Sequence, residues 1–424
     1  MNSREQKTSI LYLILEKVPF FALSIGSSFL TILAAQKGGA IGSFELYPLG
    51  MRISNILVSY VSYICKMLWP HKLAVLYPYP EIIPLWQVVG ACLFLLCISF
   101  LVIQAAQKRP YLLMGWLWYL GTLVPVIGLV QVGVQSMADR YAYVPLIGLF
   151  IIISMGGTDL LARWRHGRAM LGVTASLLLF SLIILTRYQV YFWHDSITLY
   201  GHTLKVTVNN SRIHSNLGLT LVRQGEIQEA IKHYTEALRI DPSFAIAHYN
   251  LGIALTVEGN IEDAIAHYTR ALQINPRYAA AHNKLGILLA RMEKHQEAIT
   301  HFSEALRVKP ENVELYVNLG NSLLAMGRID ESIAYYTDAL RINGYHFGAH
   351  YNLGNALFRQ GKIHEAVTYY GRSLQVKPDF AEAHYNLGLA YLMIGDRKSA
   401  IQEYQILKTI NPDLADRLSR EVIK

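Results

Sequence analysis

Two patterns of hydrophobic and polar positions divide the chain near residue 190. Before it lie long apolar runs, and after it apolar residues recur every three or four positions in short stretches separated by glycine, proline and asparagine. Runs of about 20 apolar residues can cross a bilayer as a helix, whereas the second spacing is typical of amphipathic helices. The sequence therefore predicts an all-α chain in two parts, a bundle of transmembrane helices followed by an array of short helices.

Five runs in the first part are apolar enough to span a membrane, the shorter of them as members of a bundle. A sixth stretch, 51–68, carries Arg52 and Lys66 and has its apolar residues at helical spacing, so we expect a helix that lies in the membrane interface. The predicted spans are 18–35, 85–106, 111–130, 143–157 and 169–186, within a membrane domain of residues 1–190.

The second part repeats one pattern every 34 residues. Each copy has Asn-Leu-Gly or Lys-Leu-Gly, a small residue twelve positions after the glycine and an aromatic residue four positions further on. Five of the six copies end with proline, and the fourth has Gly344 in its place. The glycines of the pattern are Gly218, Gly252, Gly286, Gly320, Gly354 and Gly388.

This spacing resembles the tetratricopeptide repeat. The resemblance implies two helices per repeat, which the glycine and the small residue keep close together and the proline ends. Stacked repeats form an α-solenoid with one continuous core and a long concave surface, and we expect caps at both ends. The predicted repeats are 211–244, 245–278, 279–312, 313–346, 347–380 and 381–412, between a capping half-repeat at 195–210 and a terminal cap at 413–424.

Charge adds a topology to this picture. The chain has a net charge of +8, and seven of these charges belong to residues 1–204. With five spans the basic residues near the membrane fall on one side, which the positive-inside rule makes cytoplasmic, whereas six spans would split them between the two sides. We therefore expect a multi-pass protein of the inner membrane with extracytoplasmic repeats, and we do not expect nucleic acid as a partner. The basic residues are Arg4, Lys7, Lys17, Lys108, Arg109, Arg163, Arg165 and Arg168.

Short motifs in the membrane part resemble the transmembrane and tetratricopeptide-repeat O-mannosyltransferase family and its bacterial relatives. They are Glu-Lys-Val-Pro-Phe-Phe-Ala-Leu-Ser at 16–24, Gly-Gly-Ala at 38–40, Trp-Pro at 69–70, Tyr-Pro at 77–78 and Ala-Asp-Arg-Tyr-Ala-Tyr-Val-Pro at 138–145. That family consists of GT-C type glycosyltransferases with a repeat solenoid outside the cytoplasm. The resemblance implies transfer of a sugar from a polyprenyl-phosphate donor to a polypeptide, with no other cofactor.

The first extracytoplasmic loop departs from that family. GT-C enzymes carry a catalytic or metal-binding acid in this loop, whereas residues 36–84 here offer only Glu45 and Glu81. The chain also begins with the Glu-Lys motif, which the family places midway through its membrane domain. We therefore expect the C-terminal part of such an enzyme, inactive alone, with a separate or lost GT-C catalytic half. A polypeptide-binding membrane scaffold and a glycosyltransferase subunit are the two candidate functions.

Asp139 and Arg140 are the candidate catalytic residues, because ionisable side chains at a membrane boundary are costly unless they are paired or hydrated. Arg140 with Tyr141 is also the candidate site for a lipid phosphate, which a guanidinium binds through two hydrogen bonds. The alternative is a structural Asp-Arg pair that fixes the loop at the interface, beside tyrosines of the aromatic belt.

Asparagine marks the sixth position of the repeats, on the first helix, where we expect it to face the groove. An amide both donates to and accepts from a peptide backbone, so a row of asparagines can hold an extended chain with little regard to its sequence. The solenoid of O-linked N-acetylglucosamine transferase is similar in this respect. Lys284 interrupts the row, and the alternative is a repeat residue that only caps and solvates. The candidate peptide-binding residues are Asn216, Asn250, Asn318, Asn352 and Asn386.

Histidine recurs at the fourth and twenty-third positions of the repeats, and the cysteines are Cys65, Cys92 and Cys97. Equivalent residues of adjacent repeats should lie roughly 10 Å apart, the distance between packed helices, which is too far to share a metal ion. The cysteines have neither disulfide-framework nor zinc-site spacing. We expect both residue types to serve packing, and no metal site.

Overall fold

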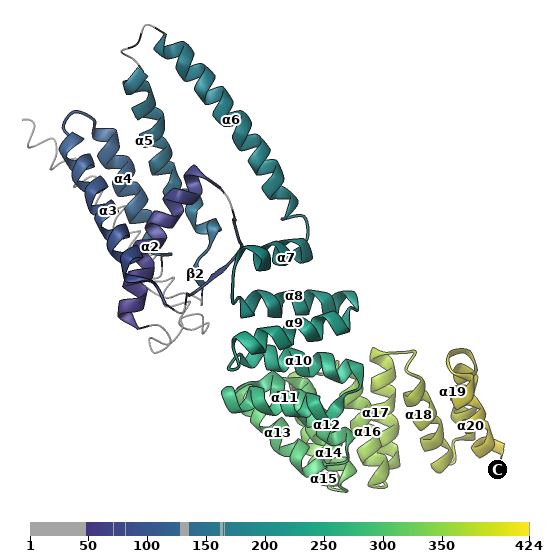
Figure 1. Ribbon diagram of the computed structural model, residues 1–424. Helices are drawn as coiled ribbons and strands as arrows, with labels where there is room; N and C mark the ends of the chain where they lie inside the picture. Colours follow the sequence, from purple (N-terminus) through teal and green to yellow (C-terminus); the bar gives the residue numbers. More distant parts are fainter. Residues whose placement is uncertain are drawn as a thin grey trace, which may run out of the picture. The chain divides into compact units, whose positions relative to one another are not determined.

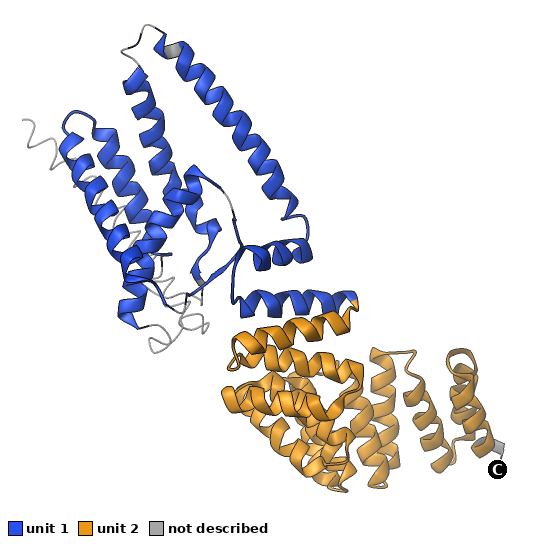
Figure 2. Cartoon of the chain, viewed as in Figure 1, with its two compact units in different colours: residues 1–224 blue, residues 225–424 orange. Residues whose placement is uncertain are grey.

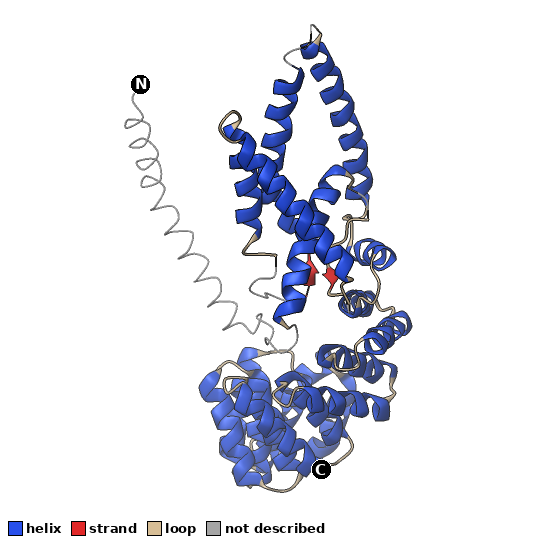
Figure 3. Ribbon diagram, turned by 60° about the vertical axis from the view of Figure 1, so that its left-hand side comes forward, coloured by secondary structure: helices blue, strands red, loops and turns tan. Residues whose placement is uncertain are grey.

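The computed structural model describes residues 48–423 apart from 71, 81, 128–134, 162, 163 and 165. Two compact units divide the chain, residues 1–224 and 225–424 (Figure 1, Figure 2). Helices make up the regular structure of the described residues except for one short pair of strands (Figure 3), which confirms the predicted all-α fold class. The predicted span at 18–35 lies outside the described residues.

The first unit combines long helices with the two short strands. The strands β1 and β2 pair antiparallel, with Tyr77 opposite Met137. The carboxylate of Asp195 caps helix α7 by accepting the N–H of Thr198 at 2.9 Å. The elements are α2 (Leu49–Leu68), β1 (Tyr77–Pro78), α3 (Leu85–Ala105), α4 (Pro110–Leu123), β2 (Gln135–Met137), the 3-10 helix η1 (Asp139–Ala142), α5 (Tyr143–Leu161), α6 (Gly167–Tyr191), α7 (Ser196–Val206) and α8 (Ser211–Gln224).

Three stretches of the described residues are long and apolar enough to cross a membrane. They coincide with α3, with η1 and α5 together, and with α6. Each of them contains or nearly matches one of the predicted spans. None of the most apolar window of α6 is buried against the rest of the protein. The three stretches are 85–105, 139–161 and 169–191.

Helix α4 begins one residue before the predicted span 111–130, but it has only 14 residues and ends at Leu123. That is shorter than the roughly 20 residues that cross a bilayer, and residues 128–130 are not described. Its Gly115 faces Gly148 of α5 so closely that a Cβ on either glycine would collide with the carbonyl oxygen of the other. Small residues of this kind let helix backbones approach in apolar surroundings.

Helix α2 buries its polar side and leaves several apolar residues exposed. Asn55 donates from Nδ2 to the carbonyl of Ser136 at 3.0 Å, and the Tyr63 hydroxyl donates to the carbonyl of Ala138 at 3.0 Å. These bonds tie the helix to β2 and to the residue before η1. The helix predicted at 51–68 thus begins two residues earlier, and polar contacts hold it against the rest of the unit.

The second unit is a stack of helix pairs that follow the 34-residue pattern (Figure 1). Several pairs turn at a glycine in the left-handed conformation, such as Gly259 with φ 93°. The elements are α9 (Ile227–Ile240), α10 (Ala245–Glu258), α11 (Ile261–Ile274), α12 (Ala279–Arg291), α13 (His295–Val308), α14 (Val313–Ala325), α15 (Ile329–Ile342), α16 (Phe347–Arg359), α17 (Ile363–Val376), α18 (Ala381–Met393), α19 (Arg397–Ile410) and α20 (Pro412–Ile423).

The glycine of each internal repeat makes room for the aromatic ring of the second helix. A Cβ on any of these glycines would lie 2.5–2.7 Å from the ring, which is closer than real side chains pack. The rings are buried, so they fill the seam between the two helices. The contacts are Gly252 with Tyr268, Gly286 with Phe302, Gly320 with Tyr336 and Gly354 with Tyr370.

The sixth repeat closes the array through α20. Its buried Leu407 occupies the position at which the fifth repeat has Ser373 and earlier repeats have alanine. A Cβ on Gly388 would meet Leu418 of α20 at 2.6 Å, so a residue of the terminal helix fills the space that the aromatic ring fills elsewhere. Leu407, Ala415 and Leu418 form one apolar cluster. The helix at the predicted cap thus completes the core.

Candidate functional site

The first helices of successive repeats contact one another, α12 with α14, α14 with α16 and α16 with α18. Asparagines connect the last three of them. Asn352 on α16 donates from Nδ2 to Oδ1 of Asn321 on α14 at 2.9 Å, and Asn386 on α18 donates to Oδ1 of Asn355 on α16 at 2.8 Å. Asn321 and Asn355 each also accept a hydrogen bond at 2.8 Å from the seam tyrosine of their own repeat. We call these four residues the asparagine row.

The asparagine row leaves one donor and one acceptor free in each of its two pairs. The Oδ1 atoms of Asn321 and Asn355 each accept two hydrogen bonds. Among the described residues, the Nδ2 amide of Asn321 and the Oδ1 atoms of Asn352 and Asn386 make no hydrogen bond. The side chains of Asn355 and Asn386 also hydrogen-bond to the hydroxyl of Tyr351, which leaves the second N–H of the Asn355 amide free. A free amide N–H beside a free carbonyl matches the acceptor and the donor of a peptide backbone.

The sequence identified only part of this arrangement. Asn352 and Asn386 were predicted, and Asn318 joins α14 to α12 by donating to Asn283 at 3.1 Å. Asn250 on α10 is half-buried and Asn216 on α8 is exposed, and among the described residues no hydrogen bond joins either side chain to the row. The peptide-binding role of the five residues stays a prediction.

Asn321 and Asn355 were missed, although the sequence carries a signal for them. Both directly follow the glycine of their repeat, so that the fourth and fifth copies read Asn-Leu-Gly-Asn. The other four copies have leucine or isoleucine at this position. The change from an aliphatic to an amide side chain on the inner face therefore marks the repeats that form the row.

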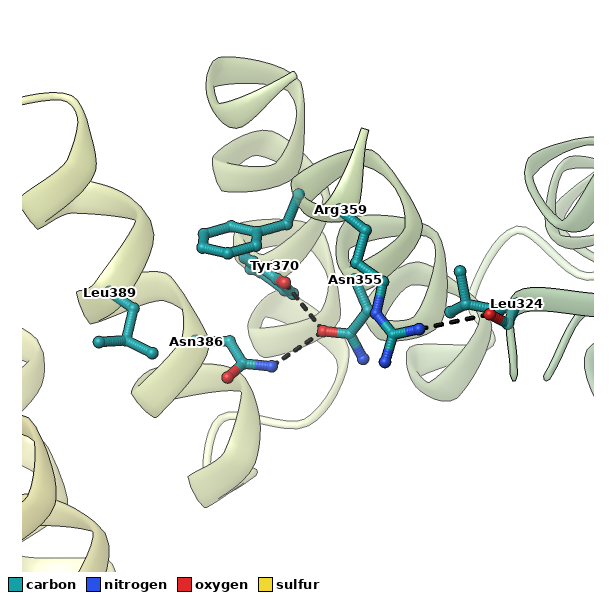
Figure 4. A pocket seen from close by; sticks show the side chains of 7 residues that line it. Leu324, Asn355, Arg359, Tyr370, Asn386 and Leu389 are labelled. Atoms are coloured by element: carbon teal, nitrogen blue, oxygen red, sulfur yellow. Dashed lines mark hydrogen bonds between the residues drawn. The ribbon is translucent and has the colours of Figure 1, made fainter. Parts of the chain in front are cut away.

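A hollow of about 360 Å³ opens beside the second pair of the row (Figure 4). Arg359 reaches across it, and its Nη1 donates to the carbonyl of Leu324 at 3.3 Å. Among the described residues, none of those that line the hollow is acidic. The lining residues are Leu324, Asn355, Phe358, Arg359, Tyr370, Asn386 and Leu389.

Histidines of the same repeat form pairs, which a comparison of equivalent positions in adjacent repeats does not predict. Nδ1 of His248 lies 3.0 Å from Nδ1 of His267, and Nδ1 of His282 lies 2.9 Å from Nδ1 of His301. The Nε2 of His248 faces the carbonyl of Pro242 at 3.2 Å, so Nε2 carries the proton and Nδ1 accepts one from His267. Among the described residues, no group of three or more metal-ligating side chains includes these pairs.

The pKa values of the paired histidines shift in different directions along the array. Burial lowers the pKa of His248. Burial and then the partner histidine lower the pKa of His267 and of His301. In the sixth repeat, burial also acts to lower the pKa of His384. The hydrogen bonds with Glu403 and with the carbonyl of Pro378, together with the charge of Glu403, outweigh it, so the pKa is raised. These shifts favour the neutral form of His248, His267 and His301, and the charged form of His384 beside Glu403.

Asp139 lies at the centre of a polar cluster in the first unit. Its Oδ2 accepts the N–H of Ala74 and the hydroxyl of Tyr77, both at 2.8 Å, and its Oδ1 lies 3.6 Å from Nζ of Lys66. Burial and then the charge of Asp139 raise the pKa of Tyr77, so this hydroxyl keeps its proton and donates it. The partner of Asp139 is thus Lys66, at the end of α2, and not the adjacent Arg140.

Arg140 is exposed and contacts two neighbours. Its Nη1 donates to the carbonyl of Val75 at 3.3 Å, and its guanidinium carbon lies 5.0 Å from the ring centroid of Tyr141. Contacts of this length orient the side chain without enclosing it. The catalytic roles of Asp139 and Arg140, and the lipid-phosphate role of Arg140 and Tyr141, stay predictions.

One curated relative and several solved structures are similar to this chain. Protein O-mannosyl-transferase TMTC4 of Mus musculus is 29% identical over 157 residues, which are 35% of this chain. The match spans only about a fifth of that relative, 21% of its length. Among solved structures, pilF of Pseudomonas aeruginosa is 25% identical with a TM-score of 0.45 and covers 50% of this chain and 97% of its own. YrrB, described as a TPR protein with an unusual peptide-binding site, is 27% identical with a TM-score of 0.38 and covers 44% and 97%.

Family models match most of the repeat array. A model described as tetratricopeptide repeat matches residues 215–279 and 283–346, one described as TPR repeat matches 354–395, and a further tetratricopeptide-repeat model matches 382–413. These ranges contain the glycine–aromatic seams and three of the four residues of the asparagine row, Asn321, Asn355 and Asn386. The C-terminal half of the chain is therefore built of tetratricopeptide repeats, as the 34-residue spacing predicted.

Proposed function

We propose that the chain is a membrane-anchored scaffold that holds extended polypeptide segments along the inner face of its repeats. The observation that carries the proposal is the asparagine row, which leaves a free donor and a free acceptor in each of two successive pairs. A peptide backbone placed there makes hydrogen bonds whatever its side chains are. Such recognition favours unfolded or extended segments over folded domains.

Removing the free donors of the row should weaken binding of extended peptides. Each amide contact contributes about 0.5–1.5 kcal/mol, so Asn321→Ala with Asn355→Ala should lower the affinity roughly tenfold. The measurement is fluorescence anisotropy of amidated random decapeptides with the purified full chain in detergent. Gln296→Ala with Gln375→Ala, which removes two exposed amides from the second helices α13 and α17, is the matched control, and circular dichroism checks that both variants keep their helices. Equal affinities of the two double variants would contradict the proposal.

We infer that the apolar helices of the first unit anchor this scaffold in a membrane. Helix α6 carries large apolar side chains that follow one another at helical spacing and are exposed. They are Leu177, Phe180 and Ile183, with exposed fractions of 63%, 64% and 64%. A surface of this kind is stable in lipid and not in water. The basic residues Lys108 and Arg109, which follow α3, support a cytoplasmic position for that end of the bundle.

Reporter fusions test the side of the membrane on which the repeats lie. Because α6 separates Arg165 from Lys205, a reporter fused after Arg165 should be cytoplasmic and one fused after Lys205 extracytoplasmic. Alkaline phosphatase and green fluorescent protein, fused at each point, read out the two compartments. Fluorescence in the cytoplasm from the fusion after Lys205 would overturn the topology, while a soluble full chain would overturn the anchor itself.

A role in protein O-glycosylation is the second candidate function, supported by the 29% identity to the mouse O-mannosyl-transferase. In that case the row would present a polypeptide for transfer of a sugar from a polyprenyl-phosphate donor. Asp139 and Arg140 would then belong to the catalytic part, with a separate GT-C half supplying the rest. Adding polyprenyl-phosphate mannose to the binding assay separates the candidates, because a scaffold alone leaves the peptide unmodified.

A further inference from the structure

We propose that the hollow beside Arg359 binds the carboxylate of an aspartate or glutamate within the extended segment, so that the scaffold selects acidic polypeptides. The inference rests on the proposed function, because it assigns one side chain of the segment that the asparagine row holds. The asparagine row by itself binds only the peptide backbone, and the hollow adds a preference for an acidic side chain.

The charge of Arg359 is uncompensated within the described part of the chain. Four other arginines of the second unit pair with a carboxylate three residues away along the chain. Among the described residues, the hydrogen-bond partner of Arg359 is instead the carbonyl of Leu324. That contact holds the guanidinium across the hollow and leaves donors for a ligand (Figure 4). The compensated pairs are Arg239 with Glu236, Arg307 with Glu304, Arg328 with Glu331 and Arg341 with Asp338.

The neighbours of Arg359 suit a carboxylate on a short apolar stem. Asn355 offers the second N–H of its Nδ2 amide on the same helix, so guanidinium and amide can donate to one carboxylate together. Phe358 and Leu389 line the hollow and can cover the methylene groups of the acidic side chain. Their apolar surface also reduces screening by water, which strengthens the attraction between the charges.

The position of the hollow favours an internal side chain over a terminal carboxylate. It adjoins the second pair of the row, Asn355 with Asn386, and the first pair lies one repeat away on α14 and α16. A backbone that uses both pairs runs past the hollow, with one residue turned into it. Successive side chains of an extended chain point in opposite directions, so a single acidic residue there is sufficient.

The third repeat supplies a matched control. Arg291 stands at the same repeat position as Arg359 and is also exposed, but Ile287 takes the place of Asn355. The test uses three amidated decapeptide libraries, random except for a central glutamate, glutamine or lysine, and the purified full chain in detergent. The parent protein should bind the glutamate library about tenfold more tightly than the glutamine library, as expected for a charge-assisted hydrogen bond. Arg359→Glu should reverse the order in favour of lysine, and Arg291→Glu should leave it unchanged.

Four outcomes would count against the inference. Equal binding of the glutamate and glutamine libraries overturns it and leaves the proposed function standing, whereas no binding of any library overturns the proposed function. An equal effect of Arg291→Glu would show a general charge attraction and no site at the hollow. Tighter binding of a glutamine library with a free carboxyl terminus would assign the hollow to chain ends and overturn the internal acidic residue.

Discussion

Gly320→Ala should destabilise the second unit by about 1–3 kcal/mol, the cost of overpacking a filled seam. The added Cβ would lie 2.5 Å from the ring of Tyr336, which is 0% exposed and cannot move aside without displacing its neighbours. The hydroxyl of the same tyrosine holds Asn321 in the asparagine row. The substitution should therefore weaken peptide binding as well as stability.

Gly371→Ala is the matched control for this experiment and should act in the opposite direction. Gly371 lies inside α17, and nothing is within 4 Å of a Cβ added there. Alanine then removes only the entropic cost of a helical glycine, so stability should rise by about 1 kcal/mol. Thermal unfolding followed by circular dichroism measures both changes. Melting temperatures that move in the same direction would mean that the seam is wrongly assigned.

Acidification should loosen the second and third repeats before the fourth. The pKa values of His248, His267 and His301 are lowered in the folded chain, so the unfolded chain binds more protons below its own pKa of about 6.5 and stability falls as the pH drops through that value. A second proton on a pair would also set two N–H groups against each other. His384 affects stability in the opposite direction. Because its pKa is raised in the folded chain, its contribution to stability is kept at acid pH.

Hydrogen exchange measured at several pH values, with correction for intrinsic rates, tests this order. Between pH 7.5 and 5, protection of α10–α13 should fall at least several-fold relative to α14 and α15, where Tyr316 faces Tyr335 instead of a histidine pair. His267→Tyr with His301→Tyr introduces the residue that the chain itself uses at Tyr335 and should remove most of the effect. Uniform loss of protection along the array would refute the role of the pairs.

The repeat architecture was predictable because its determinants return at fixed intervals. A glycine, a small residue and an aromatic residue at constant spacing define both helices of a pair, and the proline or Gly344 marks its end. Even the absence of proline in the fourth repeat has little consequence, since α15 ends at Ile342 and the backbone still turns at Asn343. Periodicity of this kind reflects local structure, because each repeat forms the same pair of helices from equivalent residues.

The candidate site was only partly predictable, because its contacts join different positions of the repeat. Asn352 meets Asn321, 31 residues earlier, and His248 meets His267, 19 residues later, so neither pair appears in a column of equivalent positions. Lys66 and Asp139 are further apart and belong to no repeat. Such pairs depend on how helices pack side by side, which spacing along the chain does not specify.

The closing contacts of the sixth repeat restrict how this protein can change its length during evolution. The seams of Gly252, Gly286, Gly320 and Gly354 are alike, so a duplicated gene segment that encodes one internal repeat would present the same surfaces that it meets. A copy added after α19 would instead have to replace Leu418 of α20, which fills the space over Gly388. Gain or loss of a repeat is thus expected among the internal copies, while the sixth repeat and α20 depend on each other.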